Sequence, residues 1–187
     1  GVAVVVLTFA AGAQTIREVT HTPGAGQYAT VTAAIAAAVN GDTIRIIDNS
    51  APYPETVIVN TPGANEALTI EGDPSLDPRP TIIGQGGTDP GGAICTLSFG
   101  ANYPAGCVIR NLILQSIDLN NDGPEYWSTI CMMRFNFNTV FENVEFDAGT
   151  PATLESALDQ FWYWTNTFNN CTFKGGVSTI MSMGGVA

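Results

Sequence analysis

The segment "WSTICMMRFNFNTVFENVEF" (127–146) is followed by a second version of itself, "LESALDQFWYWTNTFNNCTF" (154–173), with no gap in the alignment. Each residue of the first copy corresponds to the residue 27 positions later in the second. The alignment matches three pairs in particular: Phe141 with Phe168, Asn143 with Asn170, and Phe146 with Phe173. Such a period in β-rich segments predicts the stacked coils of a β-solenoid, because each repeat buries its apolar face only against its neighbours.

Two shorter copies extend the repeat in both directions. "CVIRNLIL" (107–114) aligns with the segment 32 positions later, and "STIMSM" (178–183) resembles "STICMM" (128–133). The last copy repeats the first strand of the coil and then stops. Because an open coil exposes strand edges and core, we expect further coils in the full gene, or a partner that covers this end.

Within each copy the pattern is apolar-x-apolar-x-Asn-apolar-x-apolar. Apolar residues two apart share one face of a strand, and at the Asn the phase slips by one residue, so the chain must bend there. Asn tolerates the left-handed backbone conformation that such a bend requires. Stacked coils would place Asn111, Asn143 and Asn170 in one column, where their amides could bond from coil to coil. The alternative is three independent turn residues.

The front of the chain fits the same plan. An Ala-rich run over about 31–39 predicts a helix that ends at Asn40-Gly41. Helix 31–39 would cover the open end of the first coil. We therefore expect an all-β protein, a parallel β-helix with a short N-terminal capping helix. Strands are predicted after this helix at 43–47, 55–59, 67–72 and 80–84.

The composition excludes several classes of partner. Apolar residues make up 45% of the 187-residue chain and charged residues 12%, which indicates a folded domain with a core. The formal net charge of −11, with six Lys plus Arg, argues against nucleic acid and against an anionic membrane surface. A polyanionic glycan would also be repelled unless calcium or a local basic cluster intervened.

The first residues, "GVAVVVLTFAAGAQ" (1–14), resemble part of a secretion signal. The apolar run is too short to span a bilayer, and Ala11-Gly12-Ala13 forms a small-x-small cleavage site. We predict a partial signal peptide over 1–13 and a β-helix domain over 14–187, secreted or at the cell surface, with no membrane span in the mature chain. The alternative for this segment is a buried apolar strand.

"YATVTAAIAAAVNGDTIRI" (28–46), "PYPETVIV" (52–59) and "LTIEGD" (68–73) resemble the opening of right-handed parallel β-helix proteins of the pectin-lyase-like superfamily. They are especially similar to pectin methylesterases and to uncharacterised secreted β-helix proteins. "VIRNLIL", "VFENVEF" and "TFNNCTF" resemble the coil signature of that superfamily. The resemblance covers roughly 28–187 and implies a right-handed parallel β-helix, but not a reaction, because the superfamily includes lyases, hydrolases, esterases, tailspikes and adhesins.

The catalytic motifs of the enzymes in this superfamily are missing. Neither the two-Asp motifs of the methylesterases nor the paired Asp of the polygalacturonases occurs in the chain. Asp159 replaces an apolar residue of the previous coil, and Arg134 has no acidic partner in the alignment, so these two are the catalytic candidates. Arg110 aligns with Glu142, which predicts an ion pair between coils rather than a catalytic base.

"DLNNDG" (118–123) has the spacing of the first half of a calcium loop, with Asp118, Asn120 and Asp122 as the candidate ligands. The twelfth position of an EF-hand loop would be Thr129 rather than Glu, so this is no EF-hand. Asn, Asp and Gly are also ordinary turn residues, and we interpret the segment as a turn. A structural Ca²⁺ site is the alternative, and no cofactor is required.

The aromatic run "FWYW" (161–164) cannot be buried on both faces, because alternate residues of a strand point in opposite directions. Trp162, Tyr163 and Trp164 are therefore candidates for stacking on a sugar ring, unless a loop covers them. Four cysteines are spread along the chain without a C-x-x-C pair, so disulfides and buried free thiols are equally consistent with the sequence: Cys95, Cys107, Cys131 and Cys171.

The absent motifs favour a non-catalytic module, a structural, adhesive or glycan-binding scaffold whose partner is a polysaccharide or a cell-surface protein. The alternative is a polysaccharide-active enzyme, lyase-like or esterase-like, whose catalytic coils are missing or divergent.

Overall fold

The computed structural model describes residues 14–59, 67–84, 94–99, 106–115, 128–133, 138–147, 156–161, 166–174 and 179–184. In this part of the chain the strands form three parallel sheets. Sheet A contains β1 (Ile16–Val19), β2 (Thr43–Ile46), β5 (Thr69–Gly72), β8 (Val108–Arg110), β11 (Val140–Glu142) and β14 (Thr167–Asn169). Sheet B contains β3 (Tyr53–Pro54), β6 (Thr81–Ile83), β9 (Ile113–Gln115), β12 (Glu145–Asp147) and β15 (Thr172–Lys174). Sheet C contains β4 (Val57–Val59), β7 (Ile94–Phe99), β10 (Ser128–Met133), β13 (Ser156–Phe161) and β16 (Thr179–Gly184).

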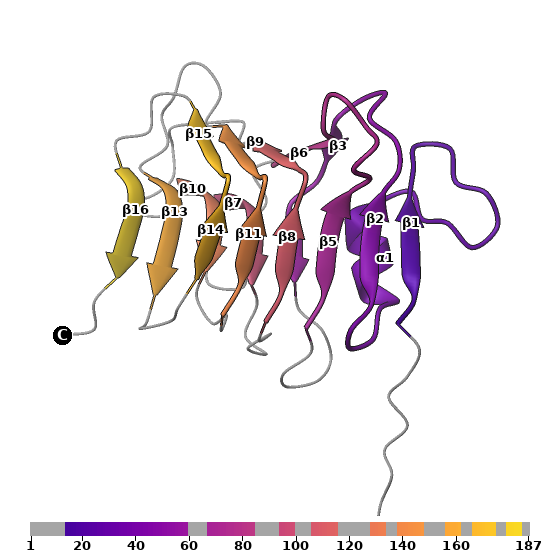
Figure 1. Ribbon diagram of the computed structural model, residues 1–187, viewed down its shortest axis with the longest axis horizontal. Coiled ribbons are helices and arrows are strands. Elements are labelled where there is room, and N and C mark those ends of the chain that lie inside the picture. The colour runs from indigo at the N-terminus through magenta and orange to yellow at the C-terminus, as the bar shows by residue number, and fades with distance from the viewer. Residues whose placement is uncertain are drawn as a thin grey trace, which may run out of the picture.

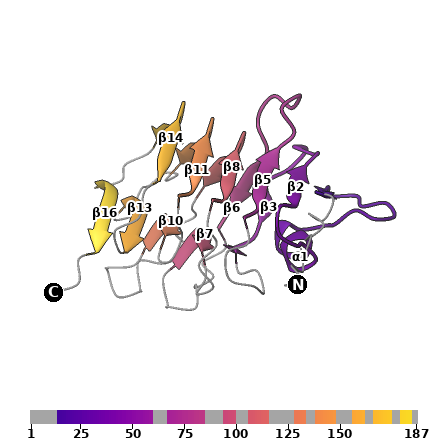
Figure 2. The ribbon, with the colours of Figure 1, turned by 60° about the horizontal axis from the view of Figure 1, so that its bottom comes forward.

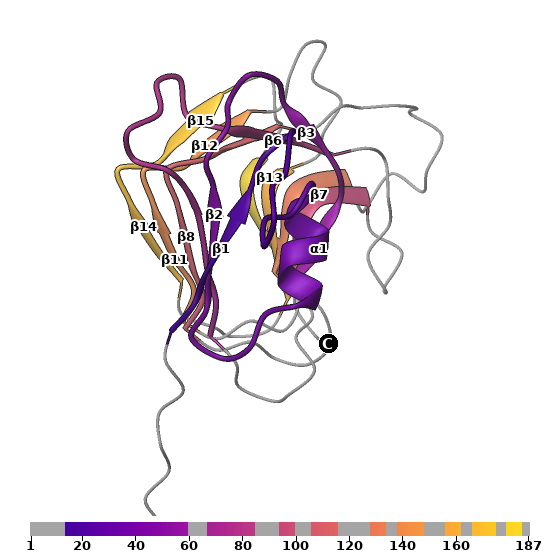
Figure 3. The same ribbon diagram turned by 90° about the vertical axis from the view of Figure 1, so that its right-hand side faces the viewer.

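From β2 onward successive strands belong to different sheets, and each sheet takes every third strand. The chain runs up sheet A, across sheet B and down sheet C before it returns to sheet A one coil further along (Figure 1). Seen from the N-terminal end this path is clockwise and leads away from the viewer, so the coil is right-handed (Figure 3). Figure 2 shows sheets A and C as two rows of strands along the same axis. The expected parallel β-helix is confirmed.

The pairing register confirms the sequence alignment. Phe141 pairs with Phe168 in sheet A, and Phe146 pairs with Phe173 in sheet B. Side chains on the outer face of sheet A, and at the bend that follows this sheet, form hydrogen bonds from one coil to the next. The bonded residues are separated along the chain by 26, 39, 32 and 27 positions in successive coils. The coils therefore differ in length while the strands keep one register, and the connections between strands absorb the difference.

The core is a set of apolar rows parallel to the axis, because one residue of each strand points inward at the same level. The rings of Phe141 and Phe168 stack with their centroids 5.0 Å apart, and those of Phe146 and Phe173 lie 4.9 Å apart. Burial of each large side chain contributes roughly 1.5–3 kcal/mol. In sheet A the row consists of Ile44, Ile70, Ile109, Phe141 and Phe168, and in sheet B of Tyr53, Ile82, Leu114, Phe146 and Phe173.

The bend between sheets A and B is made by the predicted asparagines. Asn111, Asn143 and Asn170 have φ values of 54°, 53° and 52°, in the left-handed region. The amide Nδ2 of Asn143 donates to Oδ1 of Asn111 at 3.0 Å, and that of Asn170 donates to Oδ1 of Asn143 at 3.3 Å. The asparagine column is confirmed. One coil earlier the position is Gly72, where a Cβ would clash with the carbonyl oxygen of Asn111.

The N-terminal cap differs in part from the expectation. Helix α1 (Val31–Ala36) contacts β1, β2 and β4 and covers the first coil, as predicted (Figure 3). It ends at Ala36 rather than near Val39, because the carboxylate of Asp42 accepts the Val39 amide at 3.0 Å and diverts it from the helix. Strand β1 was not expected, and it extends sheet A by one strand beyond β2.

Strand β1 carries Arg17 in the row that is apolar in later coils, paired in register with Ile44. The Arg17 guanidinium bonds Oδ2 of Asp42 at 2.8 Å and donates to the Tyr28 hydroxyl at 3.0 Å. Burial acts to raise the pKa of Asp42, but hydrogen bonds from Val39, Thr15 and Arg17 outweigh it and leave that pKa below its ordinary value. An inward charge on an outer strand also opposes pairing with another chain.

Two of the cysteines that the structure describes, Cys107 and Cys171, are free thiols. Burial raises the pKa of the Cys107 thiol, which is 1% exposed, so this group is an unreactive core residue. The alternative of a buried free thiol is confirmed at Cys107, and the free thiol of Cys171 is partly buried. The described residues contain no helix of the length and apolarity needed to cross a membrane.

Candidate binding groove over sheet A

Most of the site residues predicted from the sequence lie outside the described residues. This applies to Arg134, to the candidate calcium ligands Asp118, Asn120 and Asp122, and to the aromatic candidates Trp162, Tyr163 and Trp164. These assignments stay predictions. The described residues contain no group of three or more His, Cys, Asp or Glu side chains suited to hold a metal ion.

Asp159 lies within β13, where the described backbone fixes its register. It pairs with Met132 of β10 and with Ser182 of β16. The match with Met132 is the one that the repeat predicts, so the substitution of an acid for an apolar residue in the coil is real. The position of its side chain lies outside the described part of the structure, and its role stays a prediction.

In the part of the chain that the structure describes, a group of charged side chains lies on the outer face of sheet A. A single row of residues, one from each strand, crosses the sheet in register and alternates in charge over most of its length. The row consists of Glu18, Arg45, Glu71, Arg110, Glu142 and Asn169. Cross-strand pairs of opposite charge at this spacing stabilise a sheet, so the primary role of the row is to stabilise the fold.

Glu71 is the centre of this row and is only 1% exposed. Its Oε1 lies 2.6 Å from Nε of Arg45, and its Oε2 lies 2.6 Å from both Nε and Nη2 of Arg110. Two guanidinium groups therefore occupy both oxygens. A carboxylate held in this way holds neighbouring coils in register and is poorly suited to accept a proton from a substrate.

The predicted pair between Arg110 and Glu142 exists, but it is loose. Nη1 of Arg110 and Oε2 of Glu142 are 4.0 Å apart, and the two side chains are 41% and 43% exposed. The stronger partner of Arg110 is Glu71, which the sequence repeat did not identify. Glu71 lies 39 positions before Arg110, so the alignment at offsets of 27 and 32 did not reach it.

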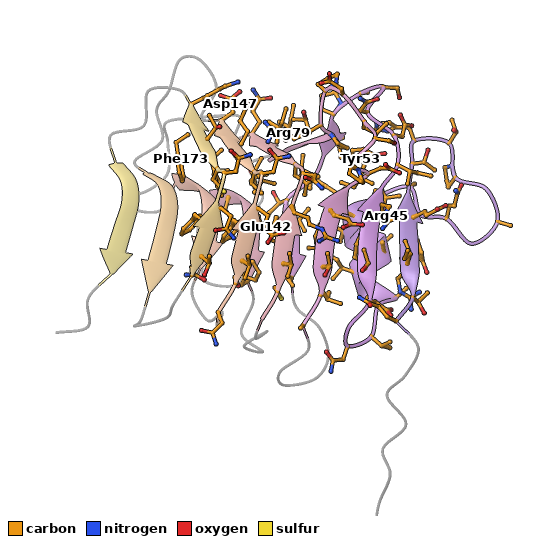
Figure 4. The ribbon with its side chains drawn as sticks, viewed as in Figure 1. Arg45, Tyr53, Arg79, Glu142, Asp147 and Phe173 are labelled. Atoms are coloured by element: carbon orange, nitrogen blue, oxygen red, sulfur yellow. The ribbon has the colours of Figure 1, made fainter. Side chains whose placement is uncertain are left out.

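A groove of about 500 Å³ lies along this row. Figure 4 shows Arg45 and Glu142 on the face of sheet A, with Arg79 at the edge of the sheet between sheets A and B. Most of the residues that line the groove have charged or amide side chains, and they come from several successive coils. It is lined by Arg45, Glu71, Pro74, Arg110, Asn111, Glu142, Asn143, Asn169 and Asn170.

One side of the groove is stabilised by a second charged cluster. Arg79, in the connection between β5 and β6, reaches Asn143 two coils away and donates to its carbonyl oxygen at 2.6 Å and to its Oδ1 at 3.1 Å. The same guanidinium lies 3.2 Å from Oε2 of Glu145, whose Oε1 is 2.6 Å from Nζ of Lys174. These contacts join the connection that carries Pro74 to the asparagine column.

His21, the one histidine of the chain, has a packing role in the structure. Its ring stacks on Tyr53 with a centroid distance of 4.2 Å, and its Nε2 lies 2.8 Å from the carbonyl oxygen of Ala51. Tyr53 is buried beneath it, and burial, together with the nearby Asp48 and Glu55, raises the pKa of Tyr53 to about 12. This cluster closes the N-terminal end of sheet B.

Comparisons with known proteins do not assign a family. No protein-family model matches the chain, and no curated protein or solved structure matches it. The parallel β-solenoid is therefore established from the structure itself, and the function has to be inferred from the groove.

Proposed function

We propose that this chain is a non-catalytic binding scaffold, secreted or displayed at a cell surface, that holds a glycan in the groove over sheet A. We also propose that it is a member of the pectin-lyase-like superfamily, which the similarity of its coil signature and its opening segment supports. The observation that carries the binding function is the groove itself, in which an exposed donor and an exposed acceptor face each other across a gap.

The rigidity of the groove supports a binding role. Its floor is a paired sheet, its buried acid Glu71 is fixed by two arginines, and the asparagine column supports its side. A ligand would meet a preformed surface, so little side-chain entropy would be lost on binding. Surface exposure of Arg110 and Glu142 leaves polar atoms available to that ligand.

A polysaccharide-active enzyme is the competing function. In the described groove the most buried carboxylate, Glu71, is already held by two arginines. The enzyme reading depends on Arg134 and Asp159, and no observation within the described side chains favours it. The scaffold is therefore the function that the groove supports best.

The proposal is tested by screening the full chain against an array of immobilised oligosaccharides and repeating the screen with Glu142→Ala. The expected result is binding that Glu142→Ala weakens by about tenfold, because a charge-assisted hydrogen bond of ~1.5 kcal/mol is lost. Glu18→Ala is the matched control, since Glu18 belongs to the same row but lies outside the groove. Absence of saccharide binding, or equal loss in both variants, would contradict the proposal.

A further inference from the structure

We infer that the groove selects a neutral, hydroxyl-rich glycan that lies lengthwise along the solenoid axis. The inference rests on the proposed binding function and adds the chemical class and the orientation of the ligand. It is carried by the charge balance of the groove, by the gap between Arg110 and Glu142, and by the succession of coils along the groove.

The charges of the groove cancel. Its lining contains two arginines, Arg45 and Arg110, and two glutamates, Glu71 and Glu142. Glu71 engages both arginines at 2.6 Å, and Glu142, 4.0 Å from Arg110, supplies the second negative charge, so the two positive charges are compensated within the protein. The formal net charge of −11 on the whole chain adds repulsion toward polyanions. A uronic acid chain would therefore find no uncompensated positive charge in the described groove, whereas a neutral sugar meets no electrostatic barrier.

The gap between Arg110 and Glu142 has the geometry of a hydroxyl site. Their nearest nitrogen and oxygen are 4.0 Å apart, too far for a hydrogen bond and close enough for one small group to touch both. A hydroxyl group can accept from the guanidinium and donate to the carboxylate at the same time. A carboxylate ligand could use only the donor, and an ammonium ligand only the acceptor.

The groove continues from this gap over neighbouring coils. Its lining residues lie in or next to β2, β5, β8, β11 and β14, which follow one another along the axis at a spacing of about 4.8 Å. The amide side chains of Asn169 and Asn170 are exposed and can each donate and accept. A ligand with repeating hydroxyl groups, lying parallel to the axis, would meet polar side chains from successive coils.

The test measures the affinity of the full chain for saccharides of defined charge and length. The probes are cellobiose and cellotetraose as neutral ligands, tetragalacturonate as an anionic ligand and a chitosan tetramer as a cationic ligand, each at 50 and 500 mM NaCl. We expect the neutral tetramer to bind more tightly than the neutral dimer, and its Kd to change by less than about twofold with salt, because no charge pair forms on binding.

Two variants locate the site. Glu142→Gln keeps the size of the side chain and removes its charge, so the affinity for the neutral tetramer should fall by about tenfold. Glu18→Gln, in the same row but outside the groove, should leave the affinity unchanged. Thermal melting of both variants checks that the fold is intact.

The outcomes separate this inference from the function on which it rests. Preferential, salt-sensitive binding of the anionic or cationic tetramer would overturn the neutral-ligand inference and leave glycan binding standing. Equal affinity for the neutral dimer and tetramer would overturn the lengthwise orientation. Failure of all four probes, at both salt concentrations and in the array screen, would overturn both proposals.

Discussion

Glu71 and Glu142 occupy the same row of the same sheet, and the structure gives them opposite roles. Glu71 is 1% exposed and has guanidinium nitrogens 2.6 Å from each carboxylate oxygen. Glu142 has a side chain that is 43% exposed, and its cation is 4.0 Å away. The difference teaches that position in a repeat does not decide what a charged residue does. The partners that neighbouring coils bring to it decide whether it stabilises the fold or stays available to a ligand.

The largest effect is expected at Glu71. Glu71→Gln leaves two arginines beside a neutral amide, and the free energy of unfolding should fall by about 2–4 kcal/mol. Glu142→Gln should change it by less than about 0.5 kcal/mol, because the pair at 4.0 Å is solvent-exposed. Urea denaturation of the two variants and the parent chain measures both values. Equal losses at the two positions would show that the two glutamates are equivalent after all.

The next effect concerns the asparagine column that supports one side of the groove. Asn143→Ala places an ordinary side chain at a φ of 53° and removes amide bonds to Asn111 and Asn170, so we expect a loss of about 2 kcal/mol. Asn143→Gly keeps the backbone conformation accessible and removes only the bonds, so its loss should be smaller. If the glycine variant is the less stable of the two in urea, backbone strain is not the reason for Asn at this corner.

A smaller effect is expected at Asp48, a carboxylate stabilised without a guanidinium. Hydrogen bonds from Ser50, partly opposed by burial, together with bonds from His21 and Thr20, lower the pKa of Asp48 to about 2. Because the folded pKa lies below the ordinary value of 3.8, the stabilisation is present above pH 3.8 and is lost as the pH falls toward 2.

Asp48→Asn should therefore reduce the stability at pH 6 by about 1 kcal/mol, after allowance for solvent screening, and should flatten the loss between pH 4 and pH 2. Thermal melting of parent and variant at pH 2, 3, 4 and 6 tests this. A parallel decline of the two proteins over that interval would place the acid sensitivity elsewhere in the molecule.

Most of the fold could be predicted from the sequence because each coil of a solenoid repeats nearly the same residue pattern. The match of Phe141 with Phe168 and the slip of phase at Asn143 reflect local rules, namely strand alternation and the backbone tolerance of Asn, and both are confirmed. The end of α1 was predicted less well. The carboxylate of Asp42, which lies beyond the helix, accepts a hydrogen bond from the Val39 amide. Helix propensities do not include such a side-chain contact.

The candidate site was predicted only in part, since ligand sites depend on side chains that converge from different coils. The ion pair of Arg110 with Glu142 follows from the repeat, and the structure contains it in a loose form. The dominant pair of Arg110 with Glu71 does not, because the two residues are 39 positions apart and the intervening coil is longer than the repeat unit. Arg79 reaches Glu145 across 66 positions, outside any periodic pattern.

By itself, then, the amino-acid sequence determined the parallel solenoid, the inward rows, the asparagine corner and the capping helix, all of which arise from periodicity and local backbone preference. Tertiary structure alone decided that Glu71 is buried between two arginines while Glu142 is exposed. It also decided that Arg79 joins the asparagine corner to Glu145 and that a groove lined mainly by charged and amide side chains lies along sheet A. The physical reason is that coil length varies while strand register does not. Stacking therefore creates neighbours that no fixed spacing along the chain encodes.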